Sequence, residues 1–205
     1  ISNGNIRAKI DTTIASNDPV EIRNIKIENR GNEEEILEVT GYFEPVLSKK
    51  EQDYAHPAFN NLFLIFDFDY ETNSIIVKRK KREENEKETY ICVNLSTHNE
   101  TIGDLEYEID EEKFMGRGNI EIPQMVKNSN PFSKKIGLVT EPIVALKRTL
   151  KIKPEQNATI NVLIAVGESK EKVIENIKKF KIEENVENAF ELSKAKNEAQ
   201  TRYLR

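Results

Sequence analysis

The segment of the chain best suited to bind a small ligand is Gly116-Arg117-Gly118. Two glycines let the backbone approach a ligand closely. An arginine between them can donate two parallel hydrogen bonds to a phosphate or to a pair of sugar hydroxyls. The alternative is a tight turn with a surface arginine, and the local sequence by itself favours that turn.

A histidine is the second candidate binding residue. His56 precedes Pro57, and a residue before proline is driven out of the helical region. We therefore predict a shaped loop between a strand that closes near Leu47 and one that starts at Leu62. His56 could form a hydrogen bond with a sugar or lie at a domain interface. The structural alternative, which the sequence favours, is a loop histidine held by Pro57 and packed under Phe59.

The 36 acidic residues do not by themselves define a catalytic site. Breaking a glycosidic bond needs a carboxylic acid with a raised pKa that faces a second carboxylate or a bound phosphate. No pair of acids is set apart by an apolar surrounding or a motif. The carboxylates considered are Glu38, Glu44, Asp53, Glu106, Glu108 and Asp110. We therefore predict no catalytic residue in this chain.

Metal and cofactor chemistry also lack a sequence signal. The chain has two histidines, His56 and His98, and one cysteine, Cys92, with none of the close spacings that zinc sites use. Cys92 lies in an apolar strand, where we expect a buried and unreactive thiol. No phosphate-binding loop, dinucleotide fingerprint or nucleophilic-serine motif occurs. We therefore predict no metal and no cofactor.

Composition excludes several classes of partner. The net charge of −5 and the pI near 5.4 argue against a nucleic-acid binder. The basic run Lys78–Arg82 is followed at once by glutamates, which indicates a solvated hairpin tip. No apolar run approaches the roughly 20 residues of a membrane helix, so we predict no membrane contact and a cytoplasmic location. The chain begins at Ile1, and we expect it to be a piece of a longer protein.

The elements that must position these residues are mostly strands. Alternation of apolar and polar residues predicts strands with little helix between them, which is typical of two large antiparallel sheets packed face to face. The predicted strands cover residues 5–15, 20–29, 37–47, 62–70, 74–82, 90–97, 141–152 and 158–166.

Four details of these strands are specific enough to test. The first three strands are expected to pair in succession, and a phase slip between Ile22 and Ile25 predicts a bulge or a twist. Residues 62–70 are apolar on both faces, which predicts an interior strand. Residues 141–152 and 158–166 form the clearest hairpin of the chain.

Helices are predicted at three places, of which the shortest is one helical turn at Ile122–Val126. Asp110 followed by acidic residues indicates a short helix that ends at Gly116. After Gly167, apolar residues recur at helical spacing, and a second helix starts near Glu183 and becomes polar toward the C-terminus. We therefore place a β-domain at residues 1–167 and the start of a helical linker at residues 168–205.

Three segments carry a resemblance to a known family. The first is Glu38–Phe63, with E-V-T-x-Y-x-E-x-V-L and D-x-A-H-P-A-F-x-x-L-F, and the others are Leu105–Asn119 and Gly137–Arg148. In this order they resemble the N-terminal β-domain of the cyclic β-1,2-glucan synthetases. That domain belongs to the phosphorylase region of glycosyltransferase family thirty-six, now glycoside hydrolase family ninety-four.

The resemblance implies a fold and a function. The fold is a mainly β, galactose-mutarotase-like supersandwich, followed by linker helices and a missing (α/α)₆ barrel. The barrel holds the catalytic aspartate, so this fragment is expected to be inactive alone. The parent enzyme would act on β-linked glucan with inorganic phosphate as co-substrate. The β-domain would brace the barrel, lend a loop near the sugar cleft and help form a homodimer.

The resemblance also bears on Gly116-Arg117-Gly118, which is similar to a family stretch F-L-G-R-G-R. Met115 and Asn119 stand where leucine and arginine are usual, so one basic group is missing and anion binding is less assured. Three alternatives remain: the β-domain of an oligoglucan or cellobiose-type phosphorylase, an independent carbohydrate-binding module, and a purely structural interaction domain. The absence of Trp and the presence of only 6 Tyr count against a sugar-stacking module.

Overall fold

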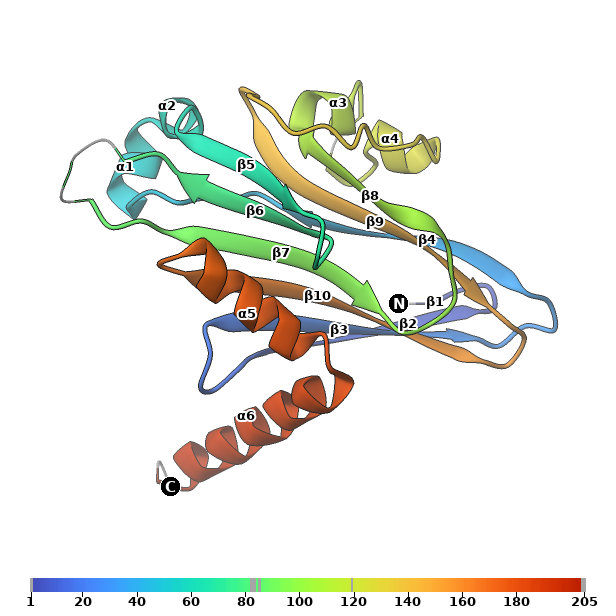
Figure 1. Ribbon diagram of the computed structural model, residues 1–205. Coiled ribbons are helices and arrows are strands. Elements are labelled where there is room, and N and C mark those ends of the chain that lie inside the picture. The colour runs from blue at the N-terminus through green and yellow to red at the C-terminus, as the bar shows by residue number, and fades with distance from the viewer. Residues whose placement is uncertain (1, 82–83, 85, 119, 204–205) are drawn as a thin grey trace.

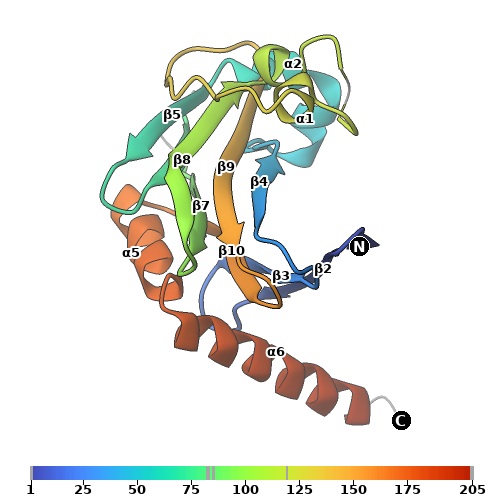
Figure 2. The same cartoon turned by 90° about the vertical axis from the view of Figure 1, so that its right-hand side faces the viewer.

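Two antiparallel sheets face each other across the main core (Figures 1 and 2). The computed structural model describes residues 2–81, 84, 86–118 and 120–203. The larger sheet has seven strands, in the order β1 (Ser2–Asn3), β2 (Ile6–Ile14), β3 (Val20–Asn29), β10 (Asn157–Gly167), β7 (Tyr90–Thr97), β6 (Ser74–Arg79) and β5 (Leu64–Asp69). The smaller sheet has the order β4 (Glu35–Phe43), β9 (Pro142–Ile152) and β8 (Thr101–Asp110). The predicted two-sheet antiparallel sandwich is confirmed, and β8 is a strand that the alternation pattern missed.

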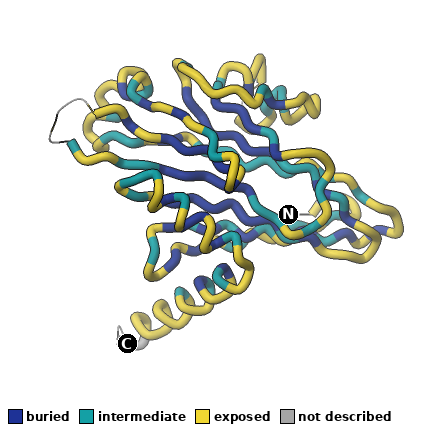
Figure 3. Tube along the Cα trace, viewed as in Figure 1, coloured by how far each residue is buried: buried dark blue, intermediate teal, exposed yellow. Residues whose placement is uncertain are grey.

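The main core lies between the two sheets. Val93, Leu95 and Ile160 of the larger sheet pack in one cluster with Leu146 and Leu150 of the smaller sheet, and all five are buried. Burying each such side chain contributes about 1.5–3 kcal/mol. Figure 3 shows this burial as a dark band along the middle of both sheets.

A second apolar layer covers the outer face of the larger sheet. Helix α5 (Lys170–Phe180) begins at Ser169, whose hydroxyl caps it by accepting the Lys172 N–H at 3.2 Å. Its buried side chains Val173, Ile177 and Phe180 pack in one cluster with residues of the larger sheet. Helix α6 (Glu183–Tyr203) continues this layer and becomes exposed toward its end (Figure 3). Both helices were predicted.

The predicted bulge in β3 is wrong. β3 pairs with β2 and with β10 without a register shift. Val20 and Ile22 belong to the cluster under α5, whereas Ile25 and Ile27 pack in the core between the sheets. The apparent phase slip arises because both faces of this strand are covered, so apolar residues serve first one face and then the other.

Two predicted pairings are also wrong. β4 does not extend the β2–β3 hairpin but pairs with β9 in the smaller sheet. β9 and β10 form no hairpin, because the connection at residues 153–156 carries the chain from one sheet to the other. Asn29, which is fully buried, stabilises this corner with two hydrogen bonds. Its side-chain Nδ2 donates to the carbonyl oxygen of Ile152 at 3.1 Å, and its backbone N–H donates to the carbonyl oxygen of Gln156 at 3.0 Å.

β5 lies at an edge rather than in the interior of the sheet. Among the described residues it pairs only with β6. Leu64 and Phe66 are buried in the core, while Ile65 on the opposite face is 37% exposed. The apolar residues on both faces of β5 were therefore a misleading signal for an interior strand.

Four short helices lie at the same end of the sandwich (Figures 1 and 2). They are α1 (Lys50–Ala55), α2 (Pro57–Asn61), α3 (Glu111–Met115) and α4 (Gln124–Lys127). Helices α3 and α4 were predicted, whereas α1 and α2 lie where a loop was predicted. The Asp110 cap of α3 accepts the Lys113 N–H at 3.4 Å. No helix in the described part of the chain is long and apolar enough to span a membrane.

The basic run Lys78–Arg82 differs from the predicted solvated tip. Lys78 and Lys80 are exposed, but Arg79 between them is buried, with 8% of its surface accessible. Arg82 lies outside the described residues.

Candidate functional site at the α3–α4 end of the sandwich

The two glycines of Gly116-Arg117-Gly118 are required by the local chain. Gly116 ends α3 with φ 57° and ψ −129°, a conformation that favours glycine. A Cβ atom on Gly118 would overlap the carbonyl oxygen of Ile122 and lie 2.9 Å from that of Met115. The turn therefore accounts for both glycines without a ligand. Asn119, which replaces the usual arginine of the resembled stretch, lies outside the described residues.

Arg117 is different, because no contact among the described residues explains its side chain. Its side chain is exposed. Within the described residues it has no hydrogen bond and no ion pair. A guanidinium held on a defined turn and left free can donate to a phosphate or to sugar hydroxyls from outside the domain. The turn thus explains the two glycines, whereas the Arg117 guanidinium is available to donate hydrogen bonds.

The segment that follows this turn is fixed to the sheet by a buried lysine. Lys147 lies on the outer face of β9 with only 3% of its side chain exposed. Its Nζ lies 3.1 Å from Glu106 Oε2 and 3.3 Å from Glu38 Oε1, and it donates to the Asn130 carbonyl oxygen at 3.0 Å. The same Nζ lies 4.8 Å from the centroid of the Phe132 ring. We call Lys147, Glu38 and Glu106 the Lys147 network.

Two glutamates of β8 hold the same segment by its backbone. Glu106 accepts the Phe132 N–H at 2.8 Å, and Glu108, which is 1% exposed, accepts the Ser133 N–H at 3.3 Å. Burial by itself would raise the pKa of Glu106, but the hydrogen bond from Phe132 and the charge of Lys147 lower it overall. These carboxylates, considered above for glycosidic chemistry, thus serve to anchor residues 130–134.

The sequence carried a faint signal for the Lys147 network. Lys147 continues the same side of β9 as Ile143 and Ala145, which are buried beneath α3 with Phe114 and Phe132. A lysine in line with apolar residues on one face of a strand indicates a buried charge that needs a carboxylate partner. The partner could not be read from the sequence, since Glu38 is 109 positions away.

A second acidic group lies beside α3. The Tyr42 hydroxyl donates to Glu44 Oε1 at 2.7 Å, and the Tyr42 ring stacks on Phe114 with centroids 5.5 Å apart. Burial, the hydrogen bond to Glu44 and the nearby negative charges all raise the pKa of Tyr42. Burial, Glu44 and Glu141 likewise raise the pKa of Glu111. Among the described residues, no three His, Cys, Asp or Glu side chains gather closely enough to hold a metal ion.

His56 lies in a separate loop at the same end of the molecule. It is the residue between α1 and α2, with φ −150° and ψ 66°, and Pro57 is the first residue of α2. Its side chain is exposed, and its carbonyl oxygen accepts the Asn60 side-chain amide at 3.0 Å. Phe59 packs edge-on against Phe63 with centroids 5.2 Å apart. The α1–α2 loop follows β4, whereas Gly116-Arg117-Gly118 follows β8, so the two predicted sites belong to different loops.

Exposed apolar side chains occur along residues 111–141, the segment that also carries Arg117. The exposed fractions in this segment are 60% for Ile120, 55% for Ile122, 39% for Val126, 37% for Ile136 and 92% for Leu138. We call these five residues the apolar rim. Exposed apolar side chains gathered on one anchored segment are typical of a surface that another protein surface covers.

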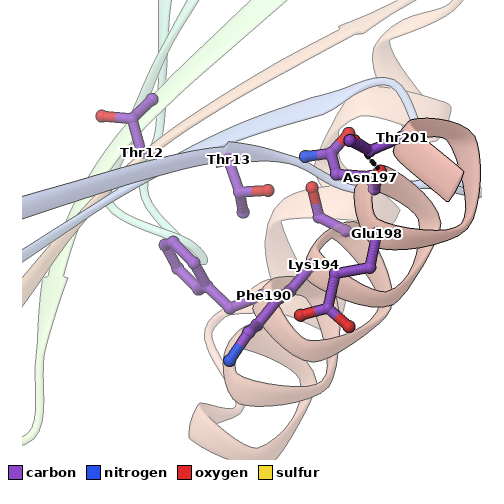
Figure 4. A pocket seen from close by; sticks show the side chains of 8 residues that line it. Thr12, Thr13, Phe190, Lys194, Asn197, Glu198 and Thr201 are labelled. Carbon is purple, nitrogen blue, oxygen red and sulfur yellow. Dashed lines mark hydrogen bonds between the residues drawn. The ribbon is translucent and has the colours of Figure 1, made fainter. Parts of the chain in front are cut away.

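A cleft on the outer face of the larger sheet is lined mainly by polar groups. It lies between β2 and α6 and has a volume of about 530 Å³ (Figure 4). Its lining combines one aromatic ring with hydroxyl, amide and charged groups: Thr12, Thr13, Phe190, Ser193, Lys194, Asn197, Glu198 and Thr201. Thr13 Oγ1 is buried and has no hydrogen-bond partner among the described residues.

A comparison with known protein families identifies the family of this domain, and two further comparisons give similar proteins. The profile of the family described as "Glycosyl hydrolase 94, supersandwich domain" matches residues 2–183. The cyclic beta-(1,2)-glucan synthase NdvB of Rhizobium meliloti (strain 1021) is 25% identical over 150 residues. That alignment covers 73% of this chain but only 5% of the relative. The solved polysaccharide lyase BACCELL_00875 aligns over 86% of this chain and 22% of its own, with 14% identity and a TM-score of 0.45.

Proposed function

Because the chain belongs to the glycosyl hydrolase 94 supersandwich domain family, we propose that it is the non-catalytic β-domain of a cyclic β-1,2-glucan synthase-like enzyme. The similarity to the synthase NdvB supports this assignment. The activity belongs to the whole enzyme, of which this chain corresponds to a small part. Catalysis, with inorganic phosphate as co-substrate, is assigned to a barrel elsewhere in that enzyme. A homodimer and a cytoplasmic location are parts of the same proposal.

The role proposed for this domain is to brace the barrel with the α3–α4 end. The observation that carries it is the apolar rim, which is exposed on a segment that the Lys147 network anchors to the sheet. Covering these side chains would remove apolar surface from water, worth about 25 cal/mol per Å². Arg117 lies within this segment and would then face the neighbouring sugar cleft with a free guanidinium.

The bracing role is tested in the longer enzyme that contains this domain. Leu138→Glu and Ile122→Glu place charges on the apolar rim and should lower glucan synthesis or phosphorolysis. The thermal stability of the isolated chain should not change, because both side chains are exposed. Lys26→Glu, an exposed position on β3, is the matched control. Unchanged activity in both rim variants would exclude this surface as the docking face.

A second candidate function is direct glycan binding, and the cleft between β2 and α6 favours it. Hydroxyl and amide groups with one aromatic ring form a lining that suits a neutral sugar. The parent could equally be an oligoglucan or cellobiose-type phosphorylase, which differs in the substrate rather than in the role of this domain.

Calorimetric titration separates these possibilities. We would titrate the chain with β-1,2-gluco-oligosaccharides, with and without phosphate, beside Arg117→Ala and Thr13→Val. Arg30→Ala, a surface arginine paired with Glu28, is the control. Binding that Thr13→Val abolishes would support a glycan site in the cleft, and loss in Arg117→Ala would support one at the turn. No heat at millimolar ligand would exclude the binding-module alternative and leave a scaffold.

A further inference from the structure

Arg79 is a buried cation that the proposed function does not use. It is the last residue of β6, and only 6% of its side chain is exposed. The guanidinium lies 5.7 Å from the centroid of the Phe63 ring. A charge removed from water to this extent needs partners for most of its five N–H groups.

The partners that the described residues offer are incomplete. Nη1 donates to the Asn60 side-chain oxygen at 3.4 Å and to the Leu47 carbonyl oxygen at 3.5 Å, both long contacts. Nε lies 3.6 Å from Glu86 Oε1, an ion pair beyond hydrogen-bond distance. Nε and Nη2 are buried, and among the described residues neither atom donates a hydrogen bond. Leaving such donors unpaired is costly.

Arg79 and Ser48 are among the residues that line a cavity, together with further cationic groups. The cavity has a volume of about 920 Å³, and its lining includes Arg79, Ser48, Lys49, Glu86 and Lys87. Ser48 Oγ is also buried without a hydrogen-bond partner among the described residues. Three of the four charged side chains in this lining are cationic, although the whole chain has a net charge of −5. We call this space the Arg79 cavity.

We propose that the Arg79 cavity binds a small oxyanion such as a phosphate group. Nε and Nη2 lie on one edge of the guanidinium, where they can donate in parallel to two oxygens of the anion. Ser48 Oγ supplies a third donor, and Lys49, which also lines the cavity, adds positive charge. The negative charge of Glu86 would repel the anion. Binding therefore requires this carboxylate to turn away from Arg79. The proposal does not depend on the proposed function of the domain.

Binding would also have a structural consequence. Ser48 precedes α1, and Arg79 ends β6. An anion held by both would add to the two long contacts that already join the α1–α2 segment, which carries His56, to the larger sheet. Protection of the α1–α2 backbone from hydrogen exchange should therefore rise when the anion is bound.

The test is a titration of the 205-residue chain followed by NMR of the backbone amides and by calorimetry. Inorganic phosphate and glucose 6-phosphate are the probes. Similar affinity for both identifies a free oxyanion as the ligand, and tighter binding of the second identifies a phosphorylated sugar. In either case the shifted amides should belong to the residues that line the Arg79 cavity, at positions 46–49, 52, 79, 86, 87, 89, 91 and 166.

Three variants and one control decide the proposal. Arg79→Lys keeps the charge but loses the parallel donors, and should weaken binding by about tenfold or more. Ser48→Ala should weaken it a few-fold, whereas Glu86→Gln should strengthen it by removing a like charge. Lys26→Ala, exposed on β3, should have no effect.

The proposal is overturned if neither probe binds, if Ser48→Ala and Glu86→Gln leave the affinity unchanged, or if Lys26→Ala has the same effect as the cavity variants. Ser48→Ala and Glu86→Gln alter residues that are not fully buried. They therefore keep the test valid even where a change at Arg79 impairs folding.

Discussion

Replacing Lys147 with methionine should destabilise the domain strongly. Methionine keeps much of the apolar stem but removes the charge that faces Glu106 and Glu38 at 3.1 and 3.3 Å. Removing one partner of a buried ion pair typically costs about 3–5 kcal/mol, because the other charge stays buried without compensation. Since Glu106 and Glu38 keep 25% and 29% of their side-chain surface, we expect the lower end of this range, about 3 kcal/mol.

The assay is equilibrium urea unfolding of both proteins near neutral pH, repeated in acid. A shift in the midpoint without a change in slope would report a loss of stability. The pKa of Glu106 is lowered in the folded protein, so its contribution is present above the ordinary carboxyl pKa and is lost as the pH falls through the lowered value. The difference between Lys147→Met and the unaltered protein should therefore shrink in acid.

A matched control lies on the same strand. Lys151 pairs with Glu34 at 3.2 Å, with 31% and 39% of the two side chains exposed. Lys151→Met should cost less than about 1 kcal/mol, as exposed pairs do. If Lys147→Met costs no more than Lys151→Met, or if its cost is the same in acid, the Lys147 network does not anchor residues 130–134 in the way argued above.

Three further predictions concern single residues. Gly118→Ala should lower the free energy of unfolding by about 1–3 kcal/mol, because the added Cβ overlaps the Ile122 carbonyl oxygen. Gly137→Ala, with open space around it, is the control, and equal unfolding midpoints of the two variants would contradict the argument. Glu111→Gln should stabilise the domain near neutral pH and not in acid, because its raised folded pKa means that ionisation opposes folding; a loss of stability near neutral pH would refute this. Burial raises the pKa of Cys92 to about 12, so its thiol should react with a disulfide reagent only after unfolding, and rapid labelling of the folded chain would be inconsistent with its burial.

Several features were determined by the sequence alone, because their causes lie within a few residues. Alternation at residues 20–29 located β3, an apolar run at residues 90–97 located β7, and an aspartate before two glutamates located the start of α3. Gly116 and Gly118 could be recognised as a turn since glycine alone tolerates a positive φ or a close backbone oxygen. The family resemblance was also carried by local motifs and agrees with the profile match.

Which strands pair was decided only by the tertiary structure. A period of two residues says that a strand has two faces, but not which sheet it joins or what covers each face. For this reason β9 and β10 were predicted to form a hairpin, although they belong to different sheets. For the same reason β5 was predicted to be an interior strand, although it lies at an edge.

The burial of charges was likewise a long-range outcome. Lys147 donates to Glu38, which is 109 positions away in the sequence, and Arg79 donates to the Leu47 carbonyl oxygen, which is 32 positions away. A lysine or arginine in a sequence is most often solvated, and only the packing of distant segments around it removes the water. The buried charges at Lys147 and Arg79 therefore became visible only when the two sheets and their loops were assembled, whereas the turn around Arg117 was already defined by its neighbouring glycines.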